Sequence, residues 1–188
     1  MIRIANAPCS WGILEFDIKN NSNYKKVLDE IKECNYSGTE LGDYGFFPTN
    51  PKKLKKELKD RNLSLVGAFV PIPLSKKENH EKGIRKALKT SHLMKKAGFS
   101  DSLIVLSDDN CTIKERTNNS GRIKNNMKLS NKEKLTFAQG ANKIAEKVLS
   151  KYNLKTVFHH HCGGYIETPD EIDFFMKKVD INATTIMN

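Results

Sequence analysis

Short apolar segments alternate with longer stretches of helical periodicity along this chain, and this alternation limits its fold more than any other feature. The apolar segments span residues 2–7, 37–41, 63–70, 103–106 and 154–161, and the helical stretches span residues 24–34, 51–61, 78–97, 130–151 and 169–179. Strands that alternate with helices are typical of parallel sheets, because the chain must cross over before it can pair in parallel. We therefore predict an α/β fold.

Local signals mark where several helices begin and end. Ser130 with Glu133, and Thr168 with Glu171, have the spacing of capping boxes, in which the two residues satisfy each other's backbone N–H groups. Gly98 is placed to end the helix that precedes it. These signals support the helix boundaries given by the periodicity.

Two segments depart from the average composition. Residues 63–70 are almost all apolar, which predicts a strand buried on both faces. Residues 107–129 are polar and are predicted to form an uninterrupted loop; loops of this length in a compact domain are usually functional or disordered, and we favour a functional role. This loop contains Arg116 and Arg122, which we expect to contact a substrate.

The composition excludes several classes of protein. The net charge of +10 arises mainly from lysines interleaved with acids, as in residues 52–57, which indicates solvated helix faces and not a nucleic-acid surface. The four cysteines are widely spaced and form no Cys-x-x-Cys pair, which fits a reducing cytoplasm. No apolar stretch approaches the roughly 20 residues of a membrane-spanning helix, so no membrane partner is expected.

Three consecutive histidines, His159 to His161, stand at the end of the fifth predicted strand. Because side chains alternate along a strand, His159 and His161 are predicted to share one face and His160 to take the other. Neutral imidazoles can bind a divalent metal or transfer protons near neutral pH. A lone strand histidine is more often a hydrogen-bonded core residue, but three in succession would each need a polar partner. We therefore expect at least one of them to serve a site.

Three further candidates lie near the ends of predicted strands. Glu40 lies near the carboxyl-terminal end of the second strand, where a carboxylate can act as a base, hold a metal or bind a hydroxyl; a surface acid is the alternative. Trp11 could form an apolar wall for a sugar ring, although a lone tryptophan is more often part of a core. Glu167 could lie at the lip of a site or, equally well, serve the start of the next helix.

Four ordered motifs resemble the xylose-isomerase-like barrel family, which contains sugar isomerases, epimerases and dehydratases and also endonuclease IV. They are APCSWGILE at residues 7–15, GTELG at 38–42, VGAFVP at 66–71 and HHHCGG at 159–164. They extend over essentially the whole chain and are most similar to inosose-dehydratase-like members. The resemblance implies an incomplete (β/α)8 TIM barrel, with about five β/α units and the start of a sixth strand present in this chain.

The resemblance also implies an activity and a cofactor. Family members hold a divalent metal ion, often manganese or cobalt, at the carboxyl-terminal mouth of the barrel. A dehydratase of this type would remove an α-proton from a small keto-polyol or sugar and expel water. The implied roles are metal ligand for His159 and catalysis for Glu40 and His161. The residues expected to contact the substrate are Trp11, Arg116, Arg122 and Glu167.

The family pattern normally continues into further strands. A closed barrel needs about 250 residues, whereas this chain has 188. The residues that follow Ala183, Thr184 to Ile186, are β-branched again, which is typical of a new strand. We therefore expect residues 1–188 to be the N-terminal portion of a single barrel domain, truncated before later strands supply more metal ligands. Such a portion would bind metal weakly, and its open strand edges favour homo-oligomers or aggregation.

Several functions stay open on the sequence alone. The leading one is a metal-dependent dehydratase acting on an inosose-like keto-polyol in inositol or carbohydrate catabolism. The second is an isomerase or epimerase that uses the same α-proton chemistry without loss of water. A non-catalytic sugar-binding half-barrel is the third. DNA cleavage ranks last, because it requires a richer set of metal ligands and loops that grip phosphates.

Overall fold

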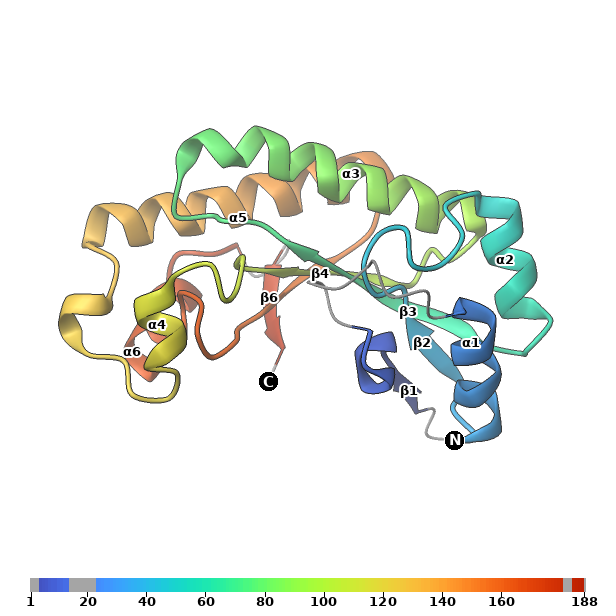
Figure 1. Cartoon of the computed structure of the whole chain (residues 1–188). Coiled ribbons are helices and arrows are strands. Elements are labelled where there is room, and N and C mark those ends of the chain that lie inside the picture. The colour runs from blue at the N-terminus through green and yellow to red at the C-terminus, as the bar shows by residue number, and fades with distance from the viewer. Residues whose placement is uncertain (1–3, 14–22, 181–183, 188) are drawn as a thin grey trace. The chain divides into compact units, whose positions relative to one another are not determined.

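The computed structural model describes residues 4–13, 23–180 and 184–187, the last four by their backbone alone. It consists of two compact units, Met1–Phe69 with Lys89–Ile104, and Val70–Leu88 with Val105–Asn188 (Figure 1). Ile2 and Arg3 of the first predicted strand, Leu14 and Glu15 of the first motif, and Ala183 lie outside the described residues.

The first unit is built on a parallel sheet with strand order β1-β2-β3-β4. Its strands are β1 (Ala5–Asn6), β2 (Gly38–Glu40), most of β3 (Ser64–Pro71) and the start of β4 (Leu103–Ser107). Its helices are α1 (Tyr24–Glu33), α2 (Pro51–Lys59) and the second half of α3 (His80–Ala97). The alternation of strands and helices follows the sequence prediction.

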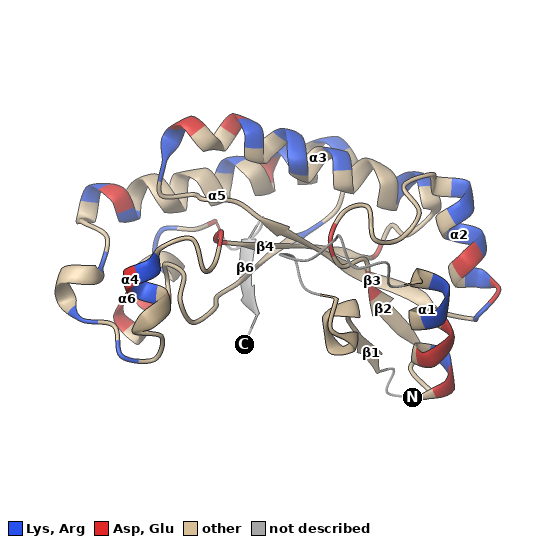
Figure 2. Ribbon diagram, viewed as in Figure 1, with Lys and Arg blue, Asp and Glu red and all other residues tan. Residues whose placement is uncertain are grey.

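Helices α1 and α2 lie side by side in this unit (Figure 1), and each buries one apolar face. Leu28 of α1 and Leu54 and Leu58 of α2 are fully buried. At the edge of the contact, Arg61 donates to Asp29 of α1 at 2.6 Å. Blue and red segments alternate along α2 (Figure 2), so its lysines form a mixed, exposed helix face, as the sequence predicted.

The sheet strands of the second unit follow the order β4-β5-β6, and β5 and β6 pair in parallel. The strands completed here are β5 (Thr156–His159) and β6 (Thr184–Met187). The helices are the first half of α3, α4 (Lys114–Asn118), α5 (Asn131–Tyr152) and α6 (Pro169–Met176). Both predicted capping boxes are confirmed, at the starts of α5 and α6.

Three phenylalanines form the centre of the core in the second unit. Phe137 of α5, Phe158 of β5 and Phe175 of α6 are fully buried. Their ring centroids are 4.5 to 5.8 Å apart. Aromatic rings at this spacing combine large apolar burial with favourable ring contacts, so the cluster joins a strand to the two helices that flank it in sequence.

Helix α5 also packs closely against the start of α3, and two glycines permit this contact (Figure 1). The ring of His80 lies against Gly140, and its Nε2 is 2.8 Å from the carbonyl oxygen of Leu74. A Cβ atom added at Gly140 would lie only 2.5 to 2.9 Å from three atoms of that ring. One added at Gly83 would lie 2.8 Å from Ile72.

Replacing Gly140 by alanine should therefore destabilise the second unit. Overpacking typically costs about 1–3 kcal/mol, of which alanine's better helix propensity offsets up to about 1 kcal/mol. Urea unfolding of Gly140→Ala beside Gln139→Ala would measure the loss, because Gln139 is an exposed neighbour on the same helix. Equal stability of the two variants would mean that α5 shifts freely away from His80.

The structure corrects three details of the sequence prediction. The connection 107–129 is not an uninterrupted loop, because it contains α4 and a 3₁₀ turn at Asn125–Met127. Strand β5 ends at His159, two residues earlier than predicted. Strand β3 is not buried on both faces, because Val66 is 38% exposed. Among the described residues, no helix combines the length and apolar character needed to cross a membrane.

Candidate active site

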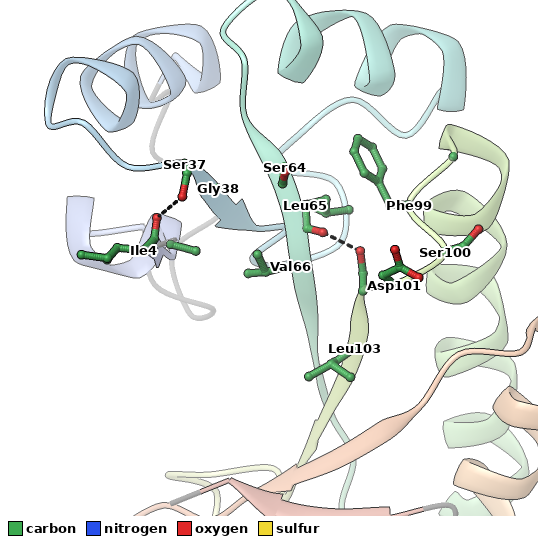
Figure 3. Close-up of a pocket in the computed structure, with 13 residues that line it drawn as sticks. Ile4, Ser37, Gly38, Ser64, Leu65, Val66, Phe99, Ser100, Asp101 and Leu103 are labelled. Atoms are coloured by element: carbon green, nitrogen blue, oxygen red, sulfur yellow. Dashed lines mark hydrogen bonds between the residues drawn. The ribbon is translucent and has the colours of Figure 1, made fainter. Parts of the chain in front are cut away.

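A cavity of about 420 Å³ lies at the amino-terminal ends of the strands in the first unit (Figure 3). Its polar groups are largely occupied by backbone contacts: Ser37 donates to the carbonyl oxygen of Ile4 at 3.0 Å, and Ser102 to that of Leu65 at 2.5 Å. In β/α folds the active site forms at the opposite, carboxyl-terminal ends of the strands. We therefore look for the site after β4 and β5.

The histidines after β5 are brought together with the end of β4. The rings of His159 and His161, which were predicted to share a face, are in edge-to-face contact, with centroids 4.2 Å apart. The side-chain amide of Asn110 lies 2.9 Å from Nδ1 of His161, and the hydroxyl of Ser107 lies 3.1 Å from the same atom. Two donors at Nδ1 favour the neutral imidazole whose proton is on Nε2.

Burial keeps both of these histidines neutral at physiological pH. It lowers the pKa of His161 to about 4, with repulsion from the two neighbouring histidines adding to the effect. Burial and the neighbouring His160 lower the pKa of His159 as well. The Nδ1 atom of His159 is buried and has no hydrogen-bond partner in the described part of the chain. An unprotonated imidazole with a free ring nitrogen can accept a proton or bind a metal ion.

Asp108 lies directly after β4 and was not predicted from the sequence. Its side chain is buried, and its Oδ2 atom accepts a hydrogen bond from the backbone N–H of Tyr165 at 2.8 Å. Burial raises its pKa from 3.8 to about 6, although backbone donors, including that of Tyr165, act in the opposite direction. A carboxyl group with this pKa can hold or release a proton close to neutral pH.

A cavity of about 420 Å³ lies beside Asp108, between the segments that follow β3 and β4. Polar side chains line much of it, among them Ser75, Asn79, Asp109 and Thr112, and the side chain of Tyr165 forms part of its wall. Its size falls within the range of pockets for small ligands. The convergence of carboxylates, hydroxyls and an aromatic ring suits a ligand that carries several hydroxyl groups.

The raised pKa of Asp108 predicts a pH-dependent stability. Because the folded-state pKa lies above that of the unfolded chain, the contribution of Asp108 to stability is fully present below about pH 4 and is lost as the pH rises through about 6. The shift corresponds to about 3 kcal/mol. Asp108→Asn should remove this part of the pH dependence, as chemical unfolding of both proteins between pH 4 and 7 would measure. A constant difference between the two proteins over that range would contradict it.

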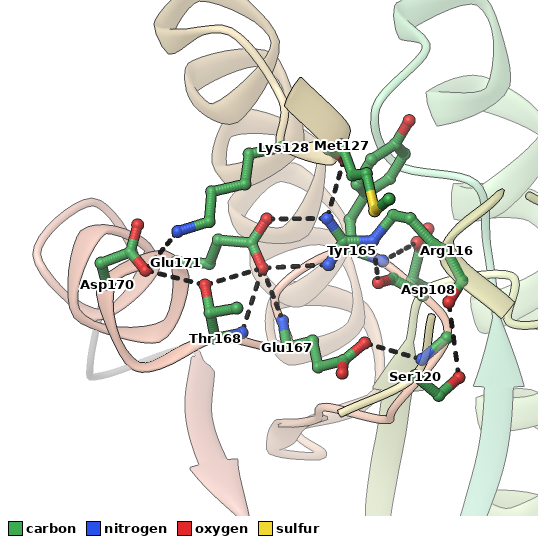
Figure 4. Close-up of polar contacts among 12 residues, drawn as sticks. Asp108, Arg116, Ser120, Met127, Lys128, Tyr165, Glu167, Thr168, Asp170 and Glu171 are labelled. Carbon is green, nitrogen blue, oxygen red and sulfur yellow. Dashed lines mark hydrogen bonds and ion pairs between the residues drawn. The ribbon is translucent and has the colours of Figure 1, made fainter. Parts of the chain in front are cut away.

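Arg116 is buried in this unit, with 1% of its surface exposed, and does not line the cavity. Its guanidinium group forms a two-pronged ion pair with Glu171, with both N–O distances 3.0 Å (Figure 4). Burial opposes ionisation of Glu171, but hydrogen bonds from Arg116 and from the backbone of Thr168 and Glu167 outweigh it and lower the pKa of Glu171. The pair is therefore ionised at neutral pH.

The other predicted substrate-contacting residues have different surroundings. Glu167 accepts hydrogen bonds from the backbone N–H groups of Gly121, at 2.5 Å, and Gly163, at 2.8 Å. Arg122 is exposed. In the first unit, Trp11 is half-buried and makes an edge contact with the ring of Tyr36 at 6.4 Å.

Glu40 is the last residue of β2, as the sequence predicted, and it is half-buried. Burial raises the pKa of its carboxyl group. The side chain is thereby suited to proton transfer nearer neutral pH than an exposed glutamate.

The described residues fit in part the metal site that the family resemblance implies. His159 fits the role of a ligand, because its buried Nδ1 lacks a partner. Within the described ranges, however, no group of three His, Cys, Asp or Glu side chains is placed to hold a metal ion together. The described residues thus provide part of a donor set and not a complete one.

Similarity to known proteins supports the resemblance seen in the motifs. No family model matches the chain. The inosose dehydratase of Lactiplantibacillus plantarum is 30% identical over 186 residues, which are 94% of this chain and 59% of that protein. A xylose isomerase-like TIM barrel protein from Mycobacterium smegmatis, solved in complex with magnesium, matches with a TM-score of 0.70 at 16% identity, over 98% of this chain and 63% of its own.

The IolI protein, solved with a bound zinc atom, matches with a TM-score of 0.69 at 11% identity, over 98% of this chain and 62% of its own. At these identities the structural matches establish the fold alone. The predicted α/β fold of a partial TIM barrel is thus confirmed. The chain is similar to inosose dehydratases in sequence and to xylose isomerase-like barrels in fold, and it spans 59 to 63% of the length of these proteins.

Proposed function

We propose that this chain is part of a metal-dependent dehydratase acting on an inosose-like keto-polyol in inositol catabolism. The observation that carries the proposal is the pair of half-buried imidazoles of His159 and His161 at the end of β5, with Asn110 joining His161 to the segment after β4 that also carries Asp108. The sequence similarity to an inosose dehydratase supports the substrate class. The activity is proposed for a protein of the length of its relatives, with residues 1–188 forming one portion of a single barrel domain.

The proposed roles follow from the surroundings of each side chain. His159 would bind a divalent ion through its unpaired Nδ1 atom. Such an ion would polarise the substrate carbonyl as a Lewis acid, and manganese and cobalt are our first candidates. His161, held at Nδ1 by Asn110, would present its Nε2 N–H group to the substrate as a hydrogen-bond donor. The raised pKa of Glu40 suits it to remove or return a proton.

The substrate would lie among hydroxyl-binding side chains. The residues that line the cavity beside Asp108 include two with carboxylates and three with hydroxyl groups, which can accept and donate hydrogen bonds to a polyol. Trp11, Arg122 and Glu167 stay predictions as substrate contacts. A cytoplasmic location and the formation of homo-oligomers also stay predictions.

The test is to assay the protein as its source makes it, with inosose and each of several divalent ions after treatment with a chelator. Loss of water, seen as a product lighter than the substrate by one water molecule, supports the dehydratase; a product of equal mass supports an isomerase or epimerase instead. Binding of inosose without any product would support a sugar-binding module.

His159→Ala should abolish turnover chiefly by lowering metal content. Loss of a direct metal ligand should reduce metal affinity by at least the roughly 10- to 100-fold that is typical when a hydrogen-bond partner of a ligand is lost. Metal analysis of the purified variant, beside His160→Ala as the matched control, would measure it. Full metal content with normal turnover in His159→Ala would remove His159 from the proposed metal site.

A further inference from the structure

One buried ion pair connects the two segments that follow β4 and β5 in the second unit. Arg116 belongs to the connection 107–129, and Glu171 belongs to the first turn of α6 (Figure 4). Each of the two side chains is only 1% exposed. Their parallel N–H···O contacts form the two-pronged geometry that fixes both distance and orientation.

Two further donors of Arg116 are directed at the backbone. Its Nε atom donates to the carbonyl oxygen of Gly164 at 2.6 Å, and Nη1 donates to that of Met127 at 3.0 Å. The guanidinium carbon also lies 5.0 Å from the centre of the Tyr165 ring, within the range of a cation–π contact. Arg116 is therefore directed at the protein and not at the proposed substrate cavity.

The segment that Arg116 holds lies against the proposed active-site residues. The N–H of Tyr165 donates to Asp108 at 2.8 Å. Gly164 lies so close to Asn110 that an added Cβ atom would overlap the amide oxygen of Asn110. Asn110 is in turn 2.9 Å from Nδ1 of His161. A displacement of Gly164 would thus reach both Asp108 and His161.

Stability alone gives little reason for such a pair. Removing two charges from water is costly, and replacing a buried ion pair by apolar side chains of similar size is often neutral or stabilising. What an apolar pair cannot supply is the set of donors that fixes the carbonyl oxygen of Gly164. The distinctive contribution of Arg116 is therefore the geometry of the segment 163–165.

We propose that Arg116 and Glu171 are positioning residues for the active site: they fix the segment 163–165 against Asp108 and Asn110 and thereby orient His161. The consequence for catalysis rests on the proposed function. The positioning itself is a property of this chain and can be measured without any substrate.

The experiment compares wild type with two variants and one control. The double variant Arg116→Met/Glu171→Leu removes both charges and the donors of Arg116 and replaces them by apolar side chains. Arg116→Lys keeps the positive charge but loses the two-pronged geometry, and it replaces the double variant in the experiment if that variant does not fold. Lys128→Ala is the control, because Lys128 pairs with Asp170 at 2.7 Å between the same two segments, with the Asp170 side chain 59% exposed. Amide hydrogen exchange, thermal unfolding and the steady-state rate constants are measured for each.

In the variants of Arg116, the amide of Tyr165 should exchange at least about 10-fold faster, while thermal unfolding of the double variant changes little. The value of kcat with inosose should fall about 10- to 100-fold, with a smaller change in KM. Lys128→Ala should match wild type. Unchanged exchange at Tyr165 in both variants would overturn the proposal, as would unchanged kcat in an active enzyme. A wild-type protein without activity on inosose would instead refute the proposed function, while the exchange result still decides the positioning.

Discussion

Phe158→Ala is expected to lower the free energy of unfolding by about 3–5 kcal/mol, the usual cost of truncating a fully buried aromatic residue. Phe158 has no exposed surface, and its ring lies 4.5 Å from that of Phe175 and 5.7 Å from that of Phe137. Its loss would leave a cavity where β5, α5 and α6 meet. Urea unfolding followed by circular dichroism would measure the effect.

Met176→Ala is the matched control for this prediction. Met176 follows Phe175 on α6 but is 38% exposed, so its truncation should change stability by no more than about 0.5 kcal/mol. Comparable losses in the two variants would show that α6 contributes through its helical structure as a whole. The aromatic cluster would then not be the centre of this core.

Most of the fold could be predicted from the sequence because its signals are local. The apolar face of α1 is set by residues spaced three and four positions apart, such as Val27, Leu28 and Ile31, all of which are buried. The start of α5 is determined by Ser130 and Glu133, which satisfy each other over a separation of three residues. Signals of this range do not depend on which strand lies next to which.

The errors arose where tertiary contacts decide the outcome. The predicted substrate contact of Arg116 followed from its position in a polar segment, but Arg116 is buried and pairs with Glu171, 55 residues later. The end of β5 was placed too late, because three histidines continue the apolar segment in sequence while the pairing with β6 stops at His159 and Met187. Neither the pairing of Arg116 with Glu171 nor the pairing of β5 with β6 can be identified from a local sequence pattern.

The candidate site was predicted only in part, because some of its residues are marked by local patterns and others only by distant contacts. His159 and His161 were predicted to share a face, and their rings are in contact, although β5 ends at His159. Asn110 and Asp108 were missed, because their importance comes from contacts with His161 and Tyr165 more than 50 residues away. The one available signal was an acidic pair, Asp108 and Asp109, directly after a buried strand.

Glu171→Gln should be as damaging as the loss of Phe158, although it changes a single atom. It leaves the guanidinium group of Arg116 buried without its counter-charge, and removing one partner of a buried pair costs about 3–5 kcal/mol. Asp170→Asn is the control: its partner Lys128 comes from the same connection, but the Asp170 carboxylate is 59% exposed, so the expected loss is at most about 1 kcal/mol.

Thermal and urea unfolding of the two variants would separate a buried pair from an exposed one at adjacent positions. A small effect of Glu171→Gln would mean that Arg116 finds water or another acceptor once the charge is gone. The connection 107–129 would then be held mainly by the hydrogen bonds that Gly121 donates to Glu167 and that Tyr165 donates to Asp108. A large effect, together with a small one for Asp170→Asn, would show that one ion pair couples this connection to the start of α6.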